Sequence, residues 1–165
     1  RANLRGMVDD LRRICGDLRP PTIDSLGLGA AISSFVREWI DRTGIGVDLA
    51  ISKDLGRLPE AIELSVFRIV QEGLNNVWRH AEASDVVVHL DRTSPRTLLL
   101  TIQDDGVGLP VGFDLGAMSA EGHYGVLGIS ERVALLGGRL QLQNRPDGGT
   151  LLQVEIPHPR SERFG

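Results

Sequence analysis

The fold of this chain is decided by one stretch, residues 63–84, which reads ELSVFRIVQEGLNNVWRHAEAS. With the residues just before it, the stretch predicts a long helix over residues 59–81, because apolar side chains recur at helical spacing. The buried face of that helix is expected to carry Ile62, Val66, Ile69, Val70, Gly73 and Val77. Gly73, Asn75 and Asn76 are poor helix formers, so their presence mid-helix needs a chemical reason.

A polar stripe is predicted beside the apolar one. It consists of Glu72, Asn76, Arg79 and His80, which follow the i, i+4, i+7, i+8 pattern of one helix face. These groups would be half buried and would line a cleft. Carboxylate and amide oxygens suit Mg²⁺, which takes few protein ligands, and Arg79 is placed to meet a phosphate oxygen. A solvated helix edge would show the same pattern, so the stripe alone does not decide the function.

The composition is that of one ordinary globular domain, with 165 residues, 41% of them hydrophobic and 24% charged. The net charge of −4 disfavours a nucleic-acid partner, and no apolar run approaches the roughly 20 residues that span a bilayer. We therefore expect no direct membrane contact and a cytoplasmic location. Cys15 is the sole cysteine, which excludes a disulfide framework. Lys53 is the sole lysine and has no glycine before it, which excludes a P-loop.

Helices and strands are partly segregated along the chain, which favours an α+β sandwich with helices on one face of a mixed sheet. Residues 1–19 carry a seam suited to a partner helix. Asp24 or Ser25 could cap the second helix, which is expected to end at Gly44. The other expected elements are a strand at 46–52, a hairpin of strands 85–92 and 97–104, a loop at 105–124, a helix at 125–138, and strands 139–144 and 150–157.

Two glycine-rich segments could contribute to a ligand site. In DDGVG, residues 104–108, a carboxylate at a strand's end could accept a hydrogen bond from an exocyclic amino group such as that of adenine. The glycines after it would let backbone approach a ligand, although an ordinary turn has the same pattern. In GHYGVLGISER, residues 122–132, glycines open a helix whose N-terminus would bind anions. Thr150 begins the last strand and could offer its hydroxyl to phosphate, or simply follow a hairpin turn.

In this order, the helix stretch, DDGVG, GHYGVLGISERVALLGG and the GGT of residues 148–150 resemble the catalytic ATP-binding domain of sensor histidine kinases. These belong to the GHKL ATPase superfamily with the Bergerat fold. RPPTIDSLGLGAAI also has a counterpart in the subfamily whose regulators are of the NarL type, so the resemblance covers about residues 18–157. It implies a two-layer α+β sandwich at 22–158, preceded by the end of a dimerisation helix at 1–21 and followed by a polar tail at 159–165.

The resemblance also implies residue roles. Asn76 matches the Mg²⁺-binding asparagine and Glu72 the acidic residue one turn earlier, and these two are the expected catalytic residues. Arg79 stands where a basic residue contacts phosphate, and His80 where a side chain packs near adenine.

Further matches concern the base and the phosphates. Asp104 matches the aspartate that reads the adenine amino group, with Gly106 and Gly108 beside it. Thr150 matches the threonine near the base and its aspartate. The expected lid over the phosphates includes Gly125, Val126, Leu127 and Gly128.

The implied function is binding of Mg·ATP and transfer of its γ-phosphoryl to a histidine on a dimerisation helix. None of the four histidines, His80, His89, His123 and His158, fits the acceptor, so we expect it upstream of residue 1. The implied partners are ATP and ADP, the protein's own dimerisation helix in a homodimer, and a response regulator. An anti-sigma-factor-like module and a degenerate scaffold are the alternatives. We expect the loop at 109–124 to be mobile without nucleotide.

Overall fold

The computed structural model describes residues 20–113 and 124–157. Three predictions fall outside these residues: the helix at 1–19, the polar tail at 159–165, and the mobility of the loop at 109–124, most of which is not described. Within them, no helix is long and apolar enough to cross a membrane.

Five strands form one mixed sheet in the order β1-β2-β3-β5-β4. β1 runs parallel to β2, and the other neighbours are antiparallel. In β3 the side chains alternate between buried and half-buried positions, because successive residues of a strand point to opposite faces. The strands are β1 (Gly46–Ile51), β2 (Asp85–Ser94), β3 (Thr97–Asp104), β4 (Arg139–Asn144) and β5 (Thr150–Pro157).

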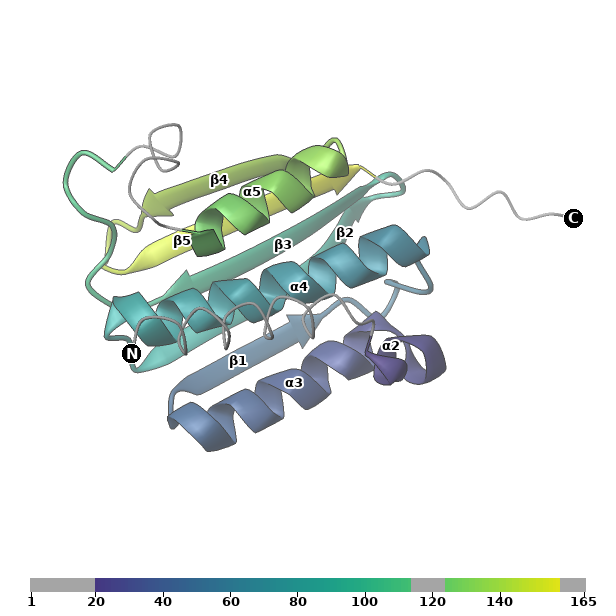
Figure 1. Cartoon of the computed structure of the whole chain (residues 1–165), viewed down its shortest axis with the longest axis horizontal. Helices are drawn as coiled ribbons and strands as arrows, with labels where there is room; N and C mark the ends of the chain where they lie inside the picture. The colour runs from purple at the N-terminus through teal and green to yellow at the C-terminus, as the bar shows by residue number, and fades with distance from the viewer. Residues whose placement is uncertain (1–19, 114–123, 158–165) are drawn as a thin grey trace, which may run out of the picture.

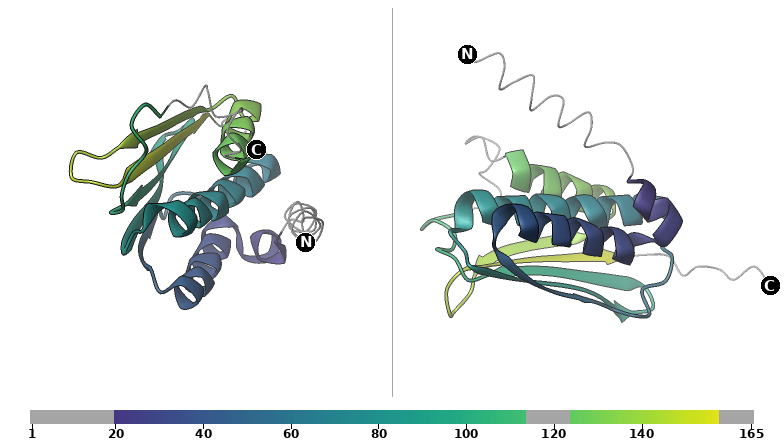
Figure 2. Two further views of the ribbon diagram at one scale, coloured as in Figure 1. Left: turned by 60° about the vertical axis from the view of Figure 1, so that its left-hand side comes forward. Right: turned by 90° about the horizontal axis from the view of Figure 1, so that it is seen from below.

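The helices cover a single face of this sheet (Figures 1 and 2). The central helix, α4, lies between α3 and α5 and contacts both. This arrangement confirms the predicted α+β sandwich with helices on one face of a mixed sheet. The helices are α2 (Pro21–Leu26), α3 (Leu28–Thr43), α4 (Glu60–Asn76), a short π-helix η1 (Val77–Ala81) and α5 (Tyr124–Leu135).

The apolar stripe predicted for α4 is buried along its whole length. Gly73 faces the sheet, where a Cβ on it would lie 2.5 Å from Cδ1 of Ile102 on β3. The glycine therefore leaves room for the Ile102 side chain between α4 and β3, which an alanine would displace. This packing accounts for its cost in helix propensity.

The second predicted helix starts differently from the expectation. Pro21 begins the short helix α2 at its first position, which suits proline because its φ is already helical. Asp24 and Ser25 lie inside α2 and do not cap it, and the Ser25 hydroxyl donates to the carbonyl of Pro21 at 3.0 Å. Gly27, with a φ of 85°, separates α2 from α3. α3 ends at Gly44 in the left-handed conformation, as predicted.

The long helix is α-helical only as far as Asn76. Pro59 is the N-cap of α4, and the last five residues, 77–81, wind as a π-helix. π-Helical turns are rare and often occur at functional sites. Because each π-turn takes up more residues than an α-turn, the side chains after Asn76 no longer follow the spacing that the sequence pattern assumed.

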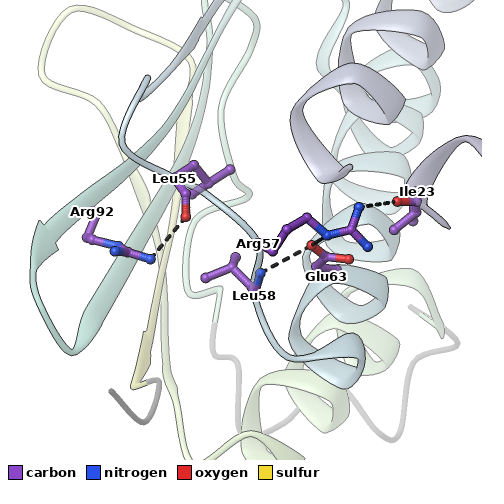
Figure 3. Close-up of polar contacts among 6 residues, drawn as sticks. All are labelled: Ile23, Leu55, Arg57, Leu58, Glu63 and Arg92. Atoms are coloured by element: carbon purple, nitrogen blue, oxygen red, sulfur yellow. Dashed lines mark hydrogen bonds and ion pairs between the residues drawn. The ribbon is translucent and has the colours of Figure 1, made fainter. Parts of the chain in front are cut away.

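A buried carboxylate ties the start of α4 to α2 (Figure 3). Glu63 is fully buried, and its Oε1 accepts a hydrogen bond from the Leu58 N–H at 3.2 Å and pairs with Nε of Arg57 at 3.3 Å. The same guanidinium donates to the carbonyl of Ile23 at 3.0 Å. On the other side of the loop, Arg92 of β2 donates to the carbonyl of Leu55 at 3.0 Å. These bonds hold the loop before α4 against both layers.

Replacing Glu63 with leucine should lower the free energy of unfolding by about 1–3 kcal/mol, because the buried Leu58 N–H loses its acceptor. Chemical denaturation measures the change. Glu38→Leu, at an exposed position of α3, is the control for exchanging a carboxylate for leucine. A Glu63→Leu protein as stable as the control would show that the ion pair and its hydrogen bond contribute no net stability.

Candidate functional site

Four segments meet at one end of the sheet, on the left of Figure 1. They are the end of α4 with η1, the end of β3, the turn between β4 and β5, and the start of α5. Asn76 ends α4, Asp104 ends β3 and Thr150 begins β5. The fold thereby gathers segments that lie far apart in the sequence and that carry the predicted site residues.

Glu72 and Asn76 are half buried and lie against the first turn of α5. A Cβ on Gly125 would lie 2.3 Å from Oε1 of Glu72 and 2.7 Å from Oδ1 of Asn76, so both oxygens face this glycine. Nδ2 of Asn76 is buried and has no hydrogen-bond partner among the described residues. Buried amide groups are normally satisfied, so this side chain is suited to a ligand.

Arg79 and His80 are exposed, which corrects the prediction that all four polar groups are half buried. Both residues belong to η1, whose wider turns move them away from the face expected of a regular α-helix. Nη1 of Arg79 still lies 3.9 Å from Oε1 of Glu72, with 47% of the Arg79 side chain exposed to solvent. The guanidinium is therefore next to the pair of oxygens and free to meet a charged group from solvent.

Asp104 is a buried carboxylate, with 4% of its surface exposed. Its Oδ1 accepts hydrogen bonds from the Gly106 N–H at 2.9 Å and the Thr150 N–H at 3.2 Å. All hydrogen bonds that described residues make to this carboxylate end on Oδ1, so Oδ2 is left as an acceptor. The structure thus brings together Asp104, Gly106 and Thr150, as the sequence motifs predicted.

The glycines of DDGVG are required by close backbone contacts. A Cβ on Gly106 would lie 2.0 Å from the carbonyl oxygen of Ala81, and the Val107 N–H donates to that oxygen at 2.8 Å. Gly108 has a φ of 79°, where a side chain is strained. The segment therefore rests directly on the last residue of η1, which couples the end of β3 to the end of the long helix.

The remaining predicted residues lie in the first turns of α5. Val126, Leu127 and Gly128 are half buried, and a Cβ on Gly128 would meet no atom within 4 Å. A side chain at 125 would therefore displace the Glu72 and Asn76 side chains, whereas position 128 has room for one. The N-terminal N–H groups of a helix attract anions, and α5 presents them beside Glu72 and Asn76.

The sequence predicted the turn between β4 and β5 and Thr150 after it, but not the contacts that Asn144 and Arg145 make with distant segments. The Asn144 side chain accepts from the Leu109 N–H at 2.6 Å and donates to the Leu109 carbonyl at 3.2 Å. Nη1 of Arg145 donates to the carbonyl of Asp104 at 2.7 Å. No local signal in NRPDGG identifies these contacts, because both partners lie more than 30 residues away along the chain.

Asp105, next to Asp104, has a structural role. Its Oδ1 accepts hydrogen bonds from the Asp85 N–H at 3.0 Å and the Ser84 N–H at 2.8 Å, which hold the start of β2. These two bonds lower the pKa of Asp105 below its usual value of 3.8, and the Arg145 charge adds a smaller effect in the same direction. The two neighbouring aspartates therefore have different roles: Asp105 stabilises the fold, and Asp104 belongs to the candidate site.

Comparison with known proteins identifies the family. The profile of the histidine kinase-, DNA gyrase B- and HSP90-like ATPase family matches residues 61–160. The chain belongs to this family. The match includes every segment of the site described above, from the end of α4 to the start of β5.

Two curated relatives are sensor kinases. The chain is 35% identical over 157 residues to the signal transduction histidine-protein kinase/phosphatase DegS of Brevibacillus brevis, covering 95% of this chain and 39% of that protein. It is 39% identical over 153 residues to UhpB of Salmonella typhimurium, another protein of that description, covering 92% of this chain and 29% of that protein. The chain thus spans well under half the length of these relatives.

A solved structure agrees with the sequence comparison. The histidine kinase domain of a blue-light activated histidine kinase from Erythrobacter litoralis EL346 superposes with a TM-score of 0.64 at 27% identity, covering 79% of this chain and 61% of that chain. The resemblance to the ATP-binding domain of sensor histidine kinases is therefore confirmed.

Asp105 predicts a defined pH dependence of stability. Since its pKa is lower in the folded chain than in the unfolded chain, its stabilising effect is full above pH 3.8 and is lost as the pH falls through the lowered folded pKa. The wild type should therefore be more stable than Asp105→Asn at neutral pH, and this gap should close in acid. Denaturant unfolding of both proteins over an acidic pH series measures the gap. Asp147→Asn, in an exposed turn, controls for the lost charge, and a gap independent of pH would contradict the assignment.

Proposed function

We propose that this chain is the nucleotide-binding kinase module of a sensor histidine kinase. It binds Mg·ATP at the end of the sheet where α4, β3, β5 and α5 meet. The observation that carries the proposal is the buried Asp104 carboxylate, whose Oδ1 is held by two backbone N–H groups. A buried acceptor fixed in this way suits a ligand that offers a neutral donor, such as the exocyclic amino group of adenine.

The base would be read by Asp104 and approached by the backbone of its neighbours. Oδ2 of Asp104 would accept the hydrogen bond of the adenine amino group. Gly106 and Gly108 would leave room for the base, and Thr150 would lie beside it, since its N–H already binds the same carboxylate. His80 is exposed and would pack near the base from the side of η1.

The phosphates and the metal would lie between α4 and the start of α5. Asn76 would hold Mg²⁺ through Oδ1, with Glu72 beside it as the second catalytic residue. The site fits this ion because the oxygens of Glu72 and Asn76, which both face Gly125, are the hard ligands that Mg²⁺ takes. The buried Nδ2 of Asn76, which has no partner among the described residues, would donate to an acceptor such as a phosphate oxygen. When bound, Mg²⁺ neutralises phosphate charge. Arg79 and the segment Gly125–Gly128 would meet the phosphate oxygens, by charge and by helix N–H groups respectively.

The longer protein would use this module for phosphoryl transfer. The γ-phosphoryl would pass to a histidine on a dimerisation helix that residues 1–21 would end, in a cytoplasmic homodimer that signals to a response regulator. In such transfers the protein mainly positions the reactants and neutralises charge. The residues gathered at this end of the sheet supply both functions.

Calorimetric titration of ATP and ADP, with and without Mg²⁺, tests the site. We expect Asp104→Ala to weaken binding about 10- to 100-fold, because a hydrogen bond to a charged group contributes about 1.5–3 kcal/mol. Asn76→Ala should remove the dependence on Mg²⁺ while the chain stays folded. Asn75→Ala, one residue earlier in the same helix, is the matched control and should keep that dependence.

Two results would contradict the proposal. A folded wild-type chain that binds neither nucleotide would favour a degenerate scaffold. Binding that is equally strong in Asp104→Ala would show that the base is not read at this carboxylate.

A further inference from the structure

The turn between β4 and β5 holds the backbone of Asp104 beyond the end of the β3–β5 pairing, whereas on the other side Asp104 still pairs with Val86 of β2. The pairing of β3 with β5 ends at Gln103 opposite Leu151, so the Asp104 carbonyl lies one residue beyond the last pair. Nη1 of Arg145 bonds to that carbonyl at 2.7 Å. A side chain therefore replaces the missing strand partner, which leaves no buried backbone acceptor unpaired at this point.

The turn packs against the same residue from a second direction. A Cβ on Gly149 would lie 2.0 Å from the Asp104 carbonyl oxygen and 3.0 Å from its Oδ1, so only glycine fits there. The turn is itself fixed, because the Arg145 N–H donates to the Gly149 carbonyl at 3.0 Å and the Gly148 N–H donates to the Arg145 carbonyl at 3.2 Å. The guanidinium thus extends from a rigid base to a single backbone atom.

We propose that Arg145 is a positioning residue for discrimination of the purine base. By holding the Asp104 backbone on the side where its pairing with β5 has ended, it fixes the direction of the free carboxylate oxygen, Oδ2. This inference rests on the proposed function, in which that oxygen accepts a hydrogen bond from an adenine amino group. In this role Arg145 touches neither the base nor the phosphates, since its hydrogen bond ends on a main-chain carbonyl.

Two simpler roles make a different prediction. If Arg145 only attracted the negative charge of a nucleotide, or only stabilised the hairpin, its loss would weaken all purine nucleotides alike. If Arg145 positions Asp104, its loss weakens the binding of a nucleotide with a 6-amino group more than the binding of a nucleotide without one. A site built to bond a donor discriminates strongly against an analogue that lacks the donor, so the ratio of two affinities separates the roles.

The experiment measures dissociation constants of ADP and inosine diphosphate for the full chain. Inosine diphosphate carries a carbonyl oxygen at the position of the amino group, so it cannot donate to Asp104 there. We expect the wild type to prefer ADP by about 10- to 100-fold. Arg145→Met keeps the aliphatic stem and removes the donor, and should reduce this preference at least about threefold, chiefly by weakening ADP. Arg139→Met, an exposed arginine at the other end of β4, loses the same charge and should leave the preference unchanged.

The outcomes are distinct. The positioning role would be overturned if Arg145→Met preferred ADP as strongly as the wild type does, or if its affinities for ADP and inosine diphosphate fell by the same factor. If Arg145→Met does not fold, Arg145→Lys gives the same test with a retained charge and a shorter donor. Its preference is expected below that of the wild type, and an unchanged preference would count against the role. A wild-type chain that binds ADP but does not discriminate would also overturn it, whereas a chain that binds neither nucleotide refutes the proposed function itself.

Discussion

The close packing of α4 on β3 is the constraint on which the rest of the structure depends. Gly73 favours it, because a Cβ there would contact the terminal methyl group of Ile102 and displace that side chain. One turn after this contact the helix reaches Asn76, and two residues after Ile102 the strand reaches Asp104. The same buried interface that supplies hydrophobic stability therefore also sets the position of the metal-binding and base-reading candidates relative to one another.

Around that interface, the site is built from backbone contacts as much as from side chains. Gly106 rests on the carbonyl of Ala81, Gly149 rests on the carbonyl of Asp104, and Gly125 faces the oxygens of Glu72 and Asn76. Gly106 and Gly149 are required by a close approach of two backbone segments, and a side chain at Gly125 would displace the Glu72 and Asn76 side chains. A ligand that enters among them would meet N–H groups and carboxylate or amide oxygens instead of bulky side chains, which suits the polar parts of a nucleotide.

Much of the fold could be predicted from sequence periodicity. The apolar stripe of α4, the alternation in β1 and the β-type runs of β2 and β3 identified those elements, and segregation of helices and strands indicated the sandwich. The errors arose where local geometry departs from a regular pattern. Pro21 begins a helix that the sequence reading placed later, and the π-helix at 77–81 exposes Arg79 and His80. Periodicity assumes a constant number of residues per turn, so it could not reveal the change.

The sequence by itself singled out the candidate site residues. Asn76 stands out because asparagine is a poor helix former, Glu72 because it lies one turn earlier on the same helix face, and Asp104 because it ends a strand just before two glycines. Only the tertiary structure decided how they are held. Asp105 fixes the start of β2 while Asp104 faces the candidate site. Asn144 and Arg145 form hydrogen bonds with segments more than 30 residues away. The physical reason is that such bonds depend on distances between strands and turns, which the local order of residues does not encode.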